Sequence, residues 1–364
     1  MHAFMALGML GALVLTPLVA RWVDRGDAAR ARAAIGVMAA ADALLVLALA
    51  APIATSAVLA LRTVEGGLHV ATSTLLLAET SRLDIARPGR ALSLGGGALL
   101  AAVAVGNVLG GALASVALDL PFVVGAALLG SVACVGPRVV TERASRPGLI
   151  APPIAWRRFA RPLGAAFVER FGIGCMVVTF SLFARSVHHL GDAEIGGLYA
   201  LVTVPFAFLM VPFARLAPSS RPGVLALGAL GYALALALIA FAPTAALVPS
   251  FALAGVASAA LYAPALREAA ELAPEEGRAR AMGAFHVAGC AGMLFGPALA
   301  GITSAIVRHA TDADTGRRAA LLLGALVSLA WLSSRVVAHV IALASADGAP
   351  SMRRARIENS LETR

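Results

Sequence analysis

Long apolar runs constrain this chain more than any other feature of its sequence. Eleven stretches of about 17–26 residues, nearly free of charge, follow one another from residue 4 to residue 343. A helix needs about 20 such residues to cross the hydrocarbon core of a bilayer, and no stretch alternates apolar with polar residues as a membrane-barrel strand does. The pattern predicts an all-α, polytopic membrane protein with about 11 transmembrane helices. The predicted spans are residues 4–20, 34–51, 55–77, 92–117, 121–137, 163–184, 196–213, 223–242, 245–266, 282–306 and 319–343.

The composition excludes several classes of function. The chain is 60% hydrophobic and 13% charged, whereas soluble domains are about 45–50% apolar and about 25% charged. All 29 basic residues are arginines, spread over many loops, so a nucleic-acid-binding face is not expected. Without lysine there is no P-loop motif for ATP, and Cys134, Cys175 and Cys290 lack the spacing of a metal or disulfide framework. We therefore expect no enzyme, no cofactor and no metal.

The arginines also indicate how the helices are oriented. One set of connections, together with the C-terminal region, holds 22 of them; the opposite set holds four, and three fall within spans. Cytoplasmic loops of membrane proteins carry the excess of basic residues. The first set is therefore expected in the cytoplasm, with residue 1 outside and the C-terminus inside, in a bacterial-type cytoplasmic (inner) membrane.

The sequence contains an internal repeat. When the chain is shifted along itself so that Arg90-Ala91 falls on Arg280-Ala281, Gly106 falls on Gly296, Leu109 on Leu299 and Gly111 on Gly301. We expect two pseudo-symmetric helical bundles related by an axis along the membrane normal, as in one class of secondary transporter. The predicted organisation is a first bundle at 1–137, a cytoplasmic linker at 138–162, a second bundle at 163–345 and a cytoplasmic tail at 346–364. The counterpart of span 163–184 would precede residue 1, so we expect it to be absent from this chain.

These features resemble the major facilitator superfamily, whose members usually have six plus six helices. The chain would then cover the second to the twelfth helix. The loop after the first span, with Asp24-Arg25 and the basic Arg30, is similar to the family's G-x-x-x-D-R-x-G-R-R loop. An acidic residue there can lie against the positive N-terminus of a neighbouring helix. The resemblance implies that Asp24, Arg25 and Arg30 form a conformational switch.

Charged residues inside the spans are candidates for proton coupling. The segment Arg62-Thr63-Val64-Glu65-Gly66 is similar to the family's R-x-x-Q-G pattern, with Glu65 in the place of Gln. Charges inside a membrane are costly, so Arg62 and Glu65, three residues apart on one helical face, are expected to pair and point into the protein. Asp42, midway along its span, faces either the cavity or a polar neighbour. The alternatives for the pair are a fixed structural ion pair or an Arg62 side chain that reaches the interface.

A glycine motif in the span 282–306 resembles the family's drug-proton antiporter pattern. The pattern G-x8-G-x3-G-P-x2-G-G is matched with one alanine in place of glycine, and the equivalent helix of the first half keeps only its final glycines. Small residues at this spacing allow close helix packing, which is also the alternative explanation. The packing residues expected here are Gly283, Gly292, Gly296, Pro297 and Gly301, with Gly106, Gly110 and Gly111 in the first half.

Four further residues are candidates for lining a substrate cavity. Glu169 and Arg170 lie about two turns into their span, where a structural ion pair is the alternative. Phe180 and His286 complete the set, although aromatic residues and lone histidines in bundles often only pack.

The function expected from the sequence is secondary active transport by alternating access. We expect proton-coupled efflux of small apolar or amphiphilic molecules by a monomer in the lipid bilayer. The alternatives are a metabolite uptake symporter and a transport-inactive remnant or membrane interaction protein.

Overall fold

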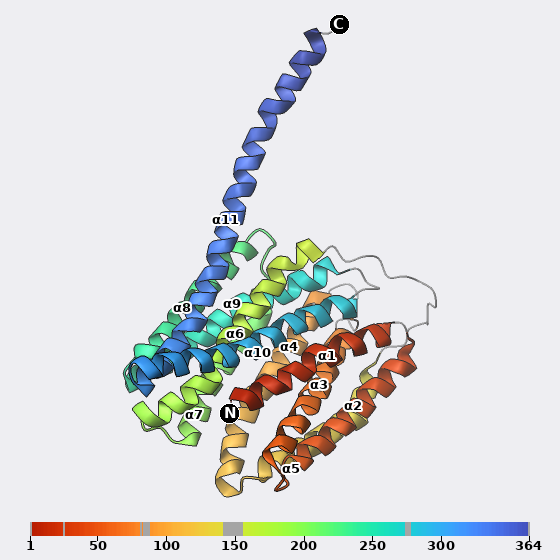
Figure 1. Cartoon of the computed structure of the whole chain (residues 1–364). Helices are drawn as coiled ribbons and strands as arrows, with labels where there is room; N and C mark the ends of the chain where they lie inside the picture. Colours follow the sequence, from red (N-terminus) through yellow and green to blue (C-terminus); the bar gives the residue numbers. More distant parts are fainter. Residues whose placement is uncertain are drawn as a thin grey trace.

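The protein is an elongated bundle of helices (Figure 1). The structure, a computed structural model, describes residues 2–24, 26–80, 82, 88–140, 156–273 and 278–362. These residues form eleven α-helices and one 3-10 turn (Gly136–Val139), so the all-α prediction is confirmed. The helices are α1 (His2–Asp24), α2 (Ala28–Ala48), α3 (Thr55–Thr80), α4 (Pro88–Val116), α5 (Leu120–Val135), α6 (Trp156–Val187), α7 (Asp192–Ala214), α8 (Arg221–Phe241), α9 (Thr244–Leu272), α10 (Arg278–Ala310) and α11 (Ala313–Glu362).

Ten of these helices are long and apolar enough to cross a membrane. The exception among the described helices is α3, which has 26 residues but carries Arg62, Glu65 and His69 in its interior. A charged side chain near the bilayer centre is tolerated when it faces the protein interior. The protein is therefore a multi-pass membrane protein in which α3 holds its charges against neighbouring helices.

The helix bounds and the packing both show the internal repeat. The start of α7 follows that of α1, and the start of α10 follows that of α4, at the separation that places Arg90 on Arg280. If a twofold exchanges α1 with α7 and α4 with α10, the contact of α1 with α10 becomes the contact of α7 with α4, and both contacts are present. The contacts of α3 with α10 and of α9 with α4 form a second such pair. The prediction of two pseudo-symmetric bundles is confirmed.

The two bundles meet along α1, α4, α7 and α10. We call α1–α5 the first half and α6–α11 the second half. In Figure 1 the red and orange helices α1, α2 and α3 lie on one side, and α6, α8, α9 and α11 lie on the other. The largest hydrophobic core lies mostly in the second half, with Phe180, Phe206 and Tyr232 among its members, and it also includes Leu77 and Leu100 of the first half. Helix α11 continues well beyond the bundle, carrying the C-terminus away from it.

The small-residue face of α10 is filled by α6. A Cβ atom added at Gly292 would overlap the carbonyl oxygen of Phe167, and one added at Gly296 would overlap that of Phe171. Helix α6 also packs on α11. In the first half, no described helix lies against α4 in this way, and a Cβ at Gly106 would meet nothing within 4 Å.

Candidate functional site

Helices α1 and α3 approach each other to backbone contact. A Cβ atom added at Gly11 would overlap the carbonyl oxygen of Thr63, and one added at Gly66 would overlap the backbone of Gly8. Only glycine leaves room for this approach, since any larger residue would push the helices apart. The consequence is that Arg62 and Glu65, beside these glycines on α3, are held against α1.

Four ionisable side chains meet in the first half at this contact. The Nη1 atom of Arg62 donates a hydrogen bond to Oε2 of Glu65, as the sequence spacing predicts. From the neighbouring helix α2, Oδ2 of Asp42 lies 3.0 Å from Nδ1 of His69. One ligand-type atom each from Asp42, Glu65 and His69 lies within 4.8 Å of the others. We call Asp42, Arg62, Glu65 and His69 the first-half charge cluster.

The charge cluster is buried unevenly. Asp42 is completely buried and Glu65 is 5% exposed, whereas the His69 side chain is 52% exposed. Oδ1 of Asp42 and Nε of Arg62 are buried and have no hydrogen-bond partner among the described residues. The guanidinium of Arg62 also stacks over the ring of Phe4, 5.0 Å from its centroid. With His69 neutral, two carboxylates face one guanidinium and the cluster carries one net negative charge; with His69 protonated, the charges balance.

The same cluster has a donor set that a metal could use. Asp42, Glu65 and His69 form the one group with suitable spacing in the part of the chain that the structure describes. Glu65 is already paired with Arg62, however, and a guanidinium beside a metal site opposes cation binding by like charge. Arg62 therefore weighs against a metal ion at these side chains.

A second group of polar side chains lies inside the second half. On α6, Glu169 is completely buried, and its Oε2 lies 3.4 Å from Nε of Arg170. Arg170 also lies over the ring of Tyr262, 5.0 Å from the centroid. The hydroxyl of Ser258 lies close to both Glu169 and the hydroxyl of Tyr232. Both hydroxyls are buried without a hydrogen-bond partner among the described residues. Glu169 and Arg170, which the sequence singles out as candidates, therefore lie in one group with these polar side chains.

One hydrogen bond joins the two halves near these groups. Nδ1 of His286, on α10, lies 2.8 Å from the hydroxyl of Thr74, on α3. The ring of His286 is also beside that of Phe285. His286 is thus placed at the junction of the halves, where relative movement of the halves would break its contact.

The other predicted residues lie apart from the two polar groups. Phe180 is fully buried in the second-half core against Phe251 and Tyr199. The backbone N–H of Arg30 donates to Asp27 at 2.9 Å, and its Nη1 donates to the carbonyl oxygen of Trp22. Arg25 and the side chain of Asp24 lie outside the described residues.

The predicted packing residues behave differently in the two halves of the protein. Gly110 and Gly111, like Gly106, face open space, whereas Gly283 comes near Ala20 of α1 across the junction. Pro297 packs on Gly174 of α6, and Gly301 is half-buried in α10.

The residues expected from the sequence include none of His69, Tyr232 and Ser258. The sequence does contain one indication of His69: it follows Glu65 by four residues, so both lie on the same helical face. Its partner Asp42 is 27 residues away on another helix. No spacing in one sequence links α6 to Tyr232 on α8 or Ser258 on α9.

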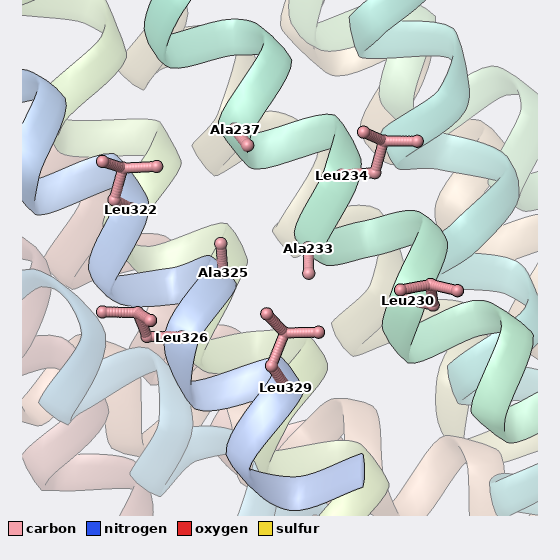
Figure 2. A pocket seen from close by; sticks show the side chains of 8 residues that line it. All are labelled: Leu230, Ala233, Leu234, Ala237, Leu322, Ala325, Leu326 and Leu329. Atoms are coloured by element: carbon pink, nitrogen blue, oxygen red, sulfur yellow. The ribbon is translucent and has the colours of Figure 1, made fainter. Parts of the chain in front are cut away.

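An apolar groove runs between α8 and α11. Figure 2 shows leucine and alanine side chains of both helices pointing into it. Its lining residues are Leu230, Ala233, Leu234, Ala237, Leu322, Ala325, Leu326 and Leu329. The groove contains no ionisable side chain, so it adds no coupling chemistry to the two polar groups.

Solved structures of transporters share this fold. The human organic anion transporter MFSD10 (TETRAN) is 19% identical, with a TM-score of 0.72 over 91% of this chain and 82% of that one. The nucleoside transporter NupG, solved as a point mutant, is 14% identical, with a TM-score of 0.66 over 92% and 90%. A bacterial homolog of the human lysosomal transporter Spinster, inward-facing and unoccupied, is 16% identical, with a TM-score of 0.60 over 91% and 88%. At these identities the likeness concerns the fold alone.

A sequence model of the Major Facilitator Superfamily matches residues 162–351, just over half of the chain. The search of curated proteins returned no match. The family match lies in the second half, and the repeat and the fold extend the same architecture to the first. The chain therefore belongs to the Major Facilitator Superfamily of membrane transporters.

Proposed function

We propose that this transporter is a proton-coupled exporter of small amphiphilic molecules. The observation that carries the proposal is the first-half charge cluster, in which the pair formed by buried Asp42 and half-exposed His69 shares one site with the Arg62–Glu65 pair. With His69 neutral the cluster carries one net negative charge, and inside a membrane such a cluster gains stability when it binds a proton. Glu65 and Asp42 are the groups that take the proton in this proposal.

His69 supplies the route by which the proton reaches the buried acid. Its side chain is half exposed while its Nδ1 contacts Asp42, which is not exposed at all. Histidine takes up and releases protons near neutral pH, so it can pass one from the exposed side to the carboxylate. Arg62 holds the Glu65 carboxylate in place while the proton moves.

The way the halves meet supports alternating access. The halves contact each other through symmetric helix pairs and through the Thr74–His286 hydrogen bond. In our proposal, a change of charge in the cluster shifts α3 and releases this bond, and the halves rock about α1, α4, α7 and α10. The predicted loop switch at Asp24, Arg25 and Arg30 would act at the end of α1.

Two observations support the direction and the kind of substrate. The glycine-proline pattern of α10 resembles that of drug-proton antiporters, which favours export. The solved structures of this fold include an organic anion transporter and a nucleoside transporter by name, which supports a small organic substrate. A metabolite uptake symporter is the second candidate in the same fold.

Everted membrane vesicles separate these possibilities. Vesicles containing the full chain are energised to an acidic interior and given ethidium, N-phenyl-1-naphthylamine or naphthalene-2-carboxylate. An exporter accumulates at least one probe inside, driven by the pH gradient, and Glu65→Gln and Asp42→Asn abolish this accumulation. Asp192→Asn is the matched control, because its carboxylate belongs to an exposed ion pair with Arg185.

The results that contradict the proposal are distinct. Loss of probe from preloaded everted vesicles, driven by the same gradient, would favour the uptake symporter. If folded protein moves no probe and dissipates no pH gradient, a transport-inactive protein is favoured. Unchanged gradient-driven accumulation in Glu65→Gln and Asp42→Asn would remove the proposed coupling site.

A further inference from the structure

The proposed proton site leaves a second pair of buried charges without a role. Glu169 has no exposed surface, and neither of its carboxyl oxygens has a hydrogen-bond partner of normal geometry among the described residues, although the Ser258 hydroxyl lies close to it. The nearest guanidinium atom is Nε of Arg170 at 3.4 Å, longer than the roughly 2.7–2.9 Å of a charge-assisted hydrogen bond. A buried carboxylate without donors is very unfavourable, so these contacts favour a neutral carboxylic acid.

Arg170 then has a charge that its surroundings do not balance. Its side chain keeps 26% of its surface exposed, while Glu169 beside it keeps none. The ring of Tyr262 faces the guanidinium at 5.0 Å, and a ring face attracts a cation without neutralising it. Glu169 is the only carboxyl group within ion-pair distance of Arg170 in the part of the chain that the structure describes.

The titratable groups around this pair offer no alternative counter-ion. Helix α8 contributes Tyr232, α9 contributes Tyr262, α10 contributes His286 and Cys290, and α6 itself contributes Cys175. None of them is a carboxyl group or a second arginine. The charge of this group of side chains is therefore set by Glu169 and Arg170.

We propose that Arg170 binds the carboxylate of an anionic, amphiphilic substrate, while Glu169 beside it is held as a neutral acid. The guanidinium presents a planar fork of donors that matches a carboxylate, and part of the Arg170 side chain is exposed and open to a bound molecule. No covalent bond forms or breaks in this step, and no proton moves. The inference rests on the proposed transport function and names its substrate class.

The test is a binding experiment that does not require transport. The purified full chain in detergent is titrated calorimetrically with naphthalene-2-carboxylate and octanoate, each paired with its neutral amide. Hydrogen bonds to a charged group contribute about 1.5–3 kcal/mol, so each carboxylate that binds should bind at least about tenfold more tightly than its amide. This comparison uses the unmodified protein and stands even if a variant fails to fold.

Three variants then assign the effect. Arg170→Gln should remove the preference for carboxylate over amide, and Arg170→Lys should retain part of it because an ammonium keeps the charge but not the fork. Glu169→Gln should leave the carboxylate affinity within about threefold, because an amide has the shape and charge of the neutral acid. Arg335→Gln is the control, since Arg335 lies on α11 beside Trp331.

Four outcomes would overturn the proposal. The first is that neither carboxylate binds, and the second is that each acid binds no more tightly than its amide. The third is that the preference for carboxylate over amide survives in Arg170→Gln. The fourth is that Glu169→Gln binds a carboxylate about tenfold or more tightly than wild type. The last would mean that Glu169 is an ionised competitor. Glu65→Gln separates this test from the proposed function, because it should stop gradient-driven transport and leave carboxylate binding in detergent unchanged.

Discussion

Replacing one glycine of α10 tests the packing on which the second half depends. In Gly296→Ala the new Cβ atom would come closer than 3.0 Å to the carbonyl oxygen of Phe171, whereas ordinary contacts begin at about 3.4 Å. Helices α6 and α10 must therefore move apart by several tenths of an ångström. Gly106→Ala is the matched control, because it lies at the equivalent place in the repeat and its Cβ would meet nothing within 4 Å.

The magnitude follows from two opposing effects. Overpacking a tight interior costs about 1–3 kcal/mol, while alanine favours a helix over glycine by about 1 kcal/mol. Gly296→Ala has both effects and Gly106→Ala has only the second, so the two variants should differ by about 1–3 kcal/mol. At about 2–4 °C per kcal/mol for a domain of 150–250 residues, Gly296→Ala should unfold roughly 2–12 °C below Gly106→Ala.

Thermal unfolding of the purified variants in the same detergent measures this difference. Because membrane proteins often unfold irreversibly, both variants are heated at one scan rate and compared by apparent midpoint. Equal midpoints would refute the account of the α6–α10 contact. A lower midpoint for Gly106→Ala would show that its face of α4 is packed.

Three further predictions concern helix ends and connections. Glu271→Gln leaves the buried Arg221 without its carboxylate partner and should cost about 1.5–3 kcal/mol, measured by thermal unfolding against wild type; an unchanged midpoint would contradict it. Asp27→Ala removes the cap of α2 and should cost about 1 kcal/mol, whereas Asp27→Asn should retain most of it; equal losses would show that capping is not the cause. Hydrogen bonds from Thr315 lower the pKa of Asp312 below its usual 3.8. The ionised carboxylate therefore contributes stability at pH values above 3.8, and this contribution is lost as the pH falls through the lowered pKa. Proteolysis of the α10–α11 connection should accelerate as the pH falls through that value, and Asp312→Asn should remove this pH dependence.

The fold could be read from the sequence because its determinants are local. Each apolar run specifies a helix by its own length, and the separation of the repeated sequence motifs reappears in the starts of α7 and α10. Glycines in the span 282–306 indicated close packing, but only the structure identifies α6 as the helix that fills this face and α4 as the helix whose face is open. Long-range partners are not encoded in spacing.

For the candidate site, too, only contacts within one helix could be predicted from the sequence. Arg62 and Glu65 lie three residues apart on one helix, and their pairing follows from helical geometry. The Asp42–His69 contact joins α2 to α3, and the Thr74–His286 bond joins the two halves. Both depend on how helices pack, so sequence spacing could identify these residues as polar but not as partners.

The central claim is that movement of substrate across the membrane is tied to movement of protons through the first-half charge cluster. The most direct measurement follows substrate movement and proton movement together in proteoliposomes that contain the purified chain. An internal dye reports the pH, and the substrate is a probe that wild-type protein transports. Probe movement down its own gradient should drive protons in the opposite direction, and Glu65→Gln should exchange probe across the membrane without moving protons. Probe transport by wild-type protein with no proton movement, or proton movement that persists in Glu65→Gln, would contradict the claim.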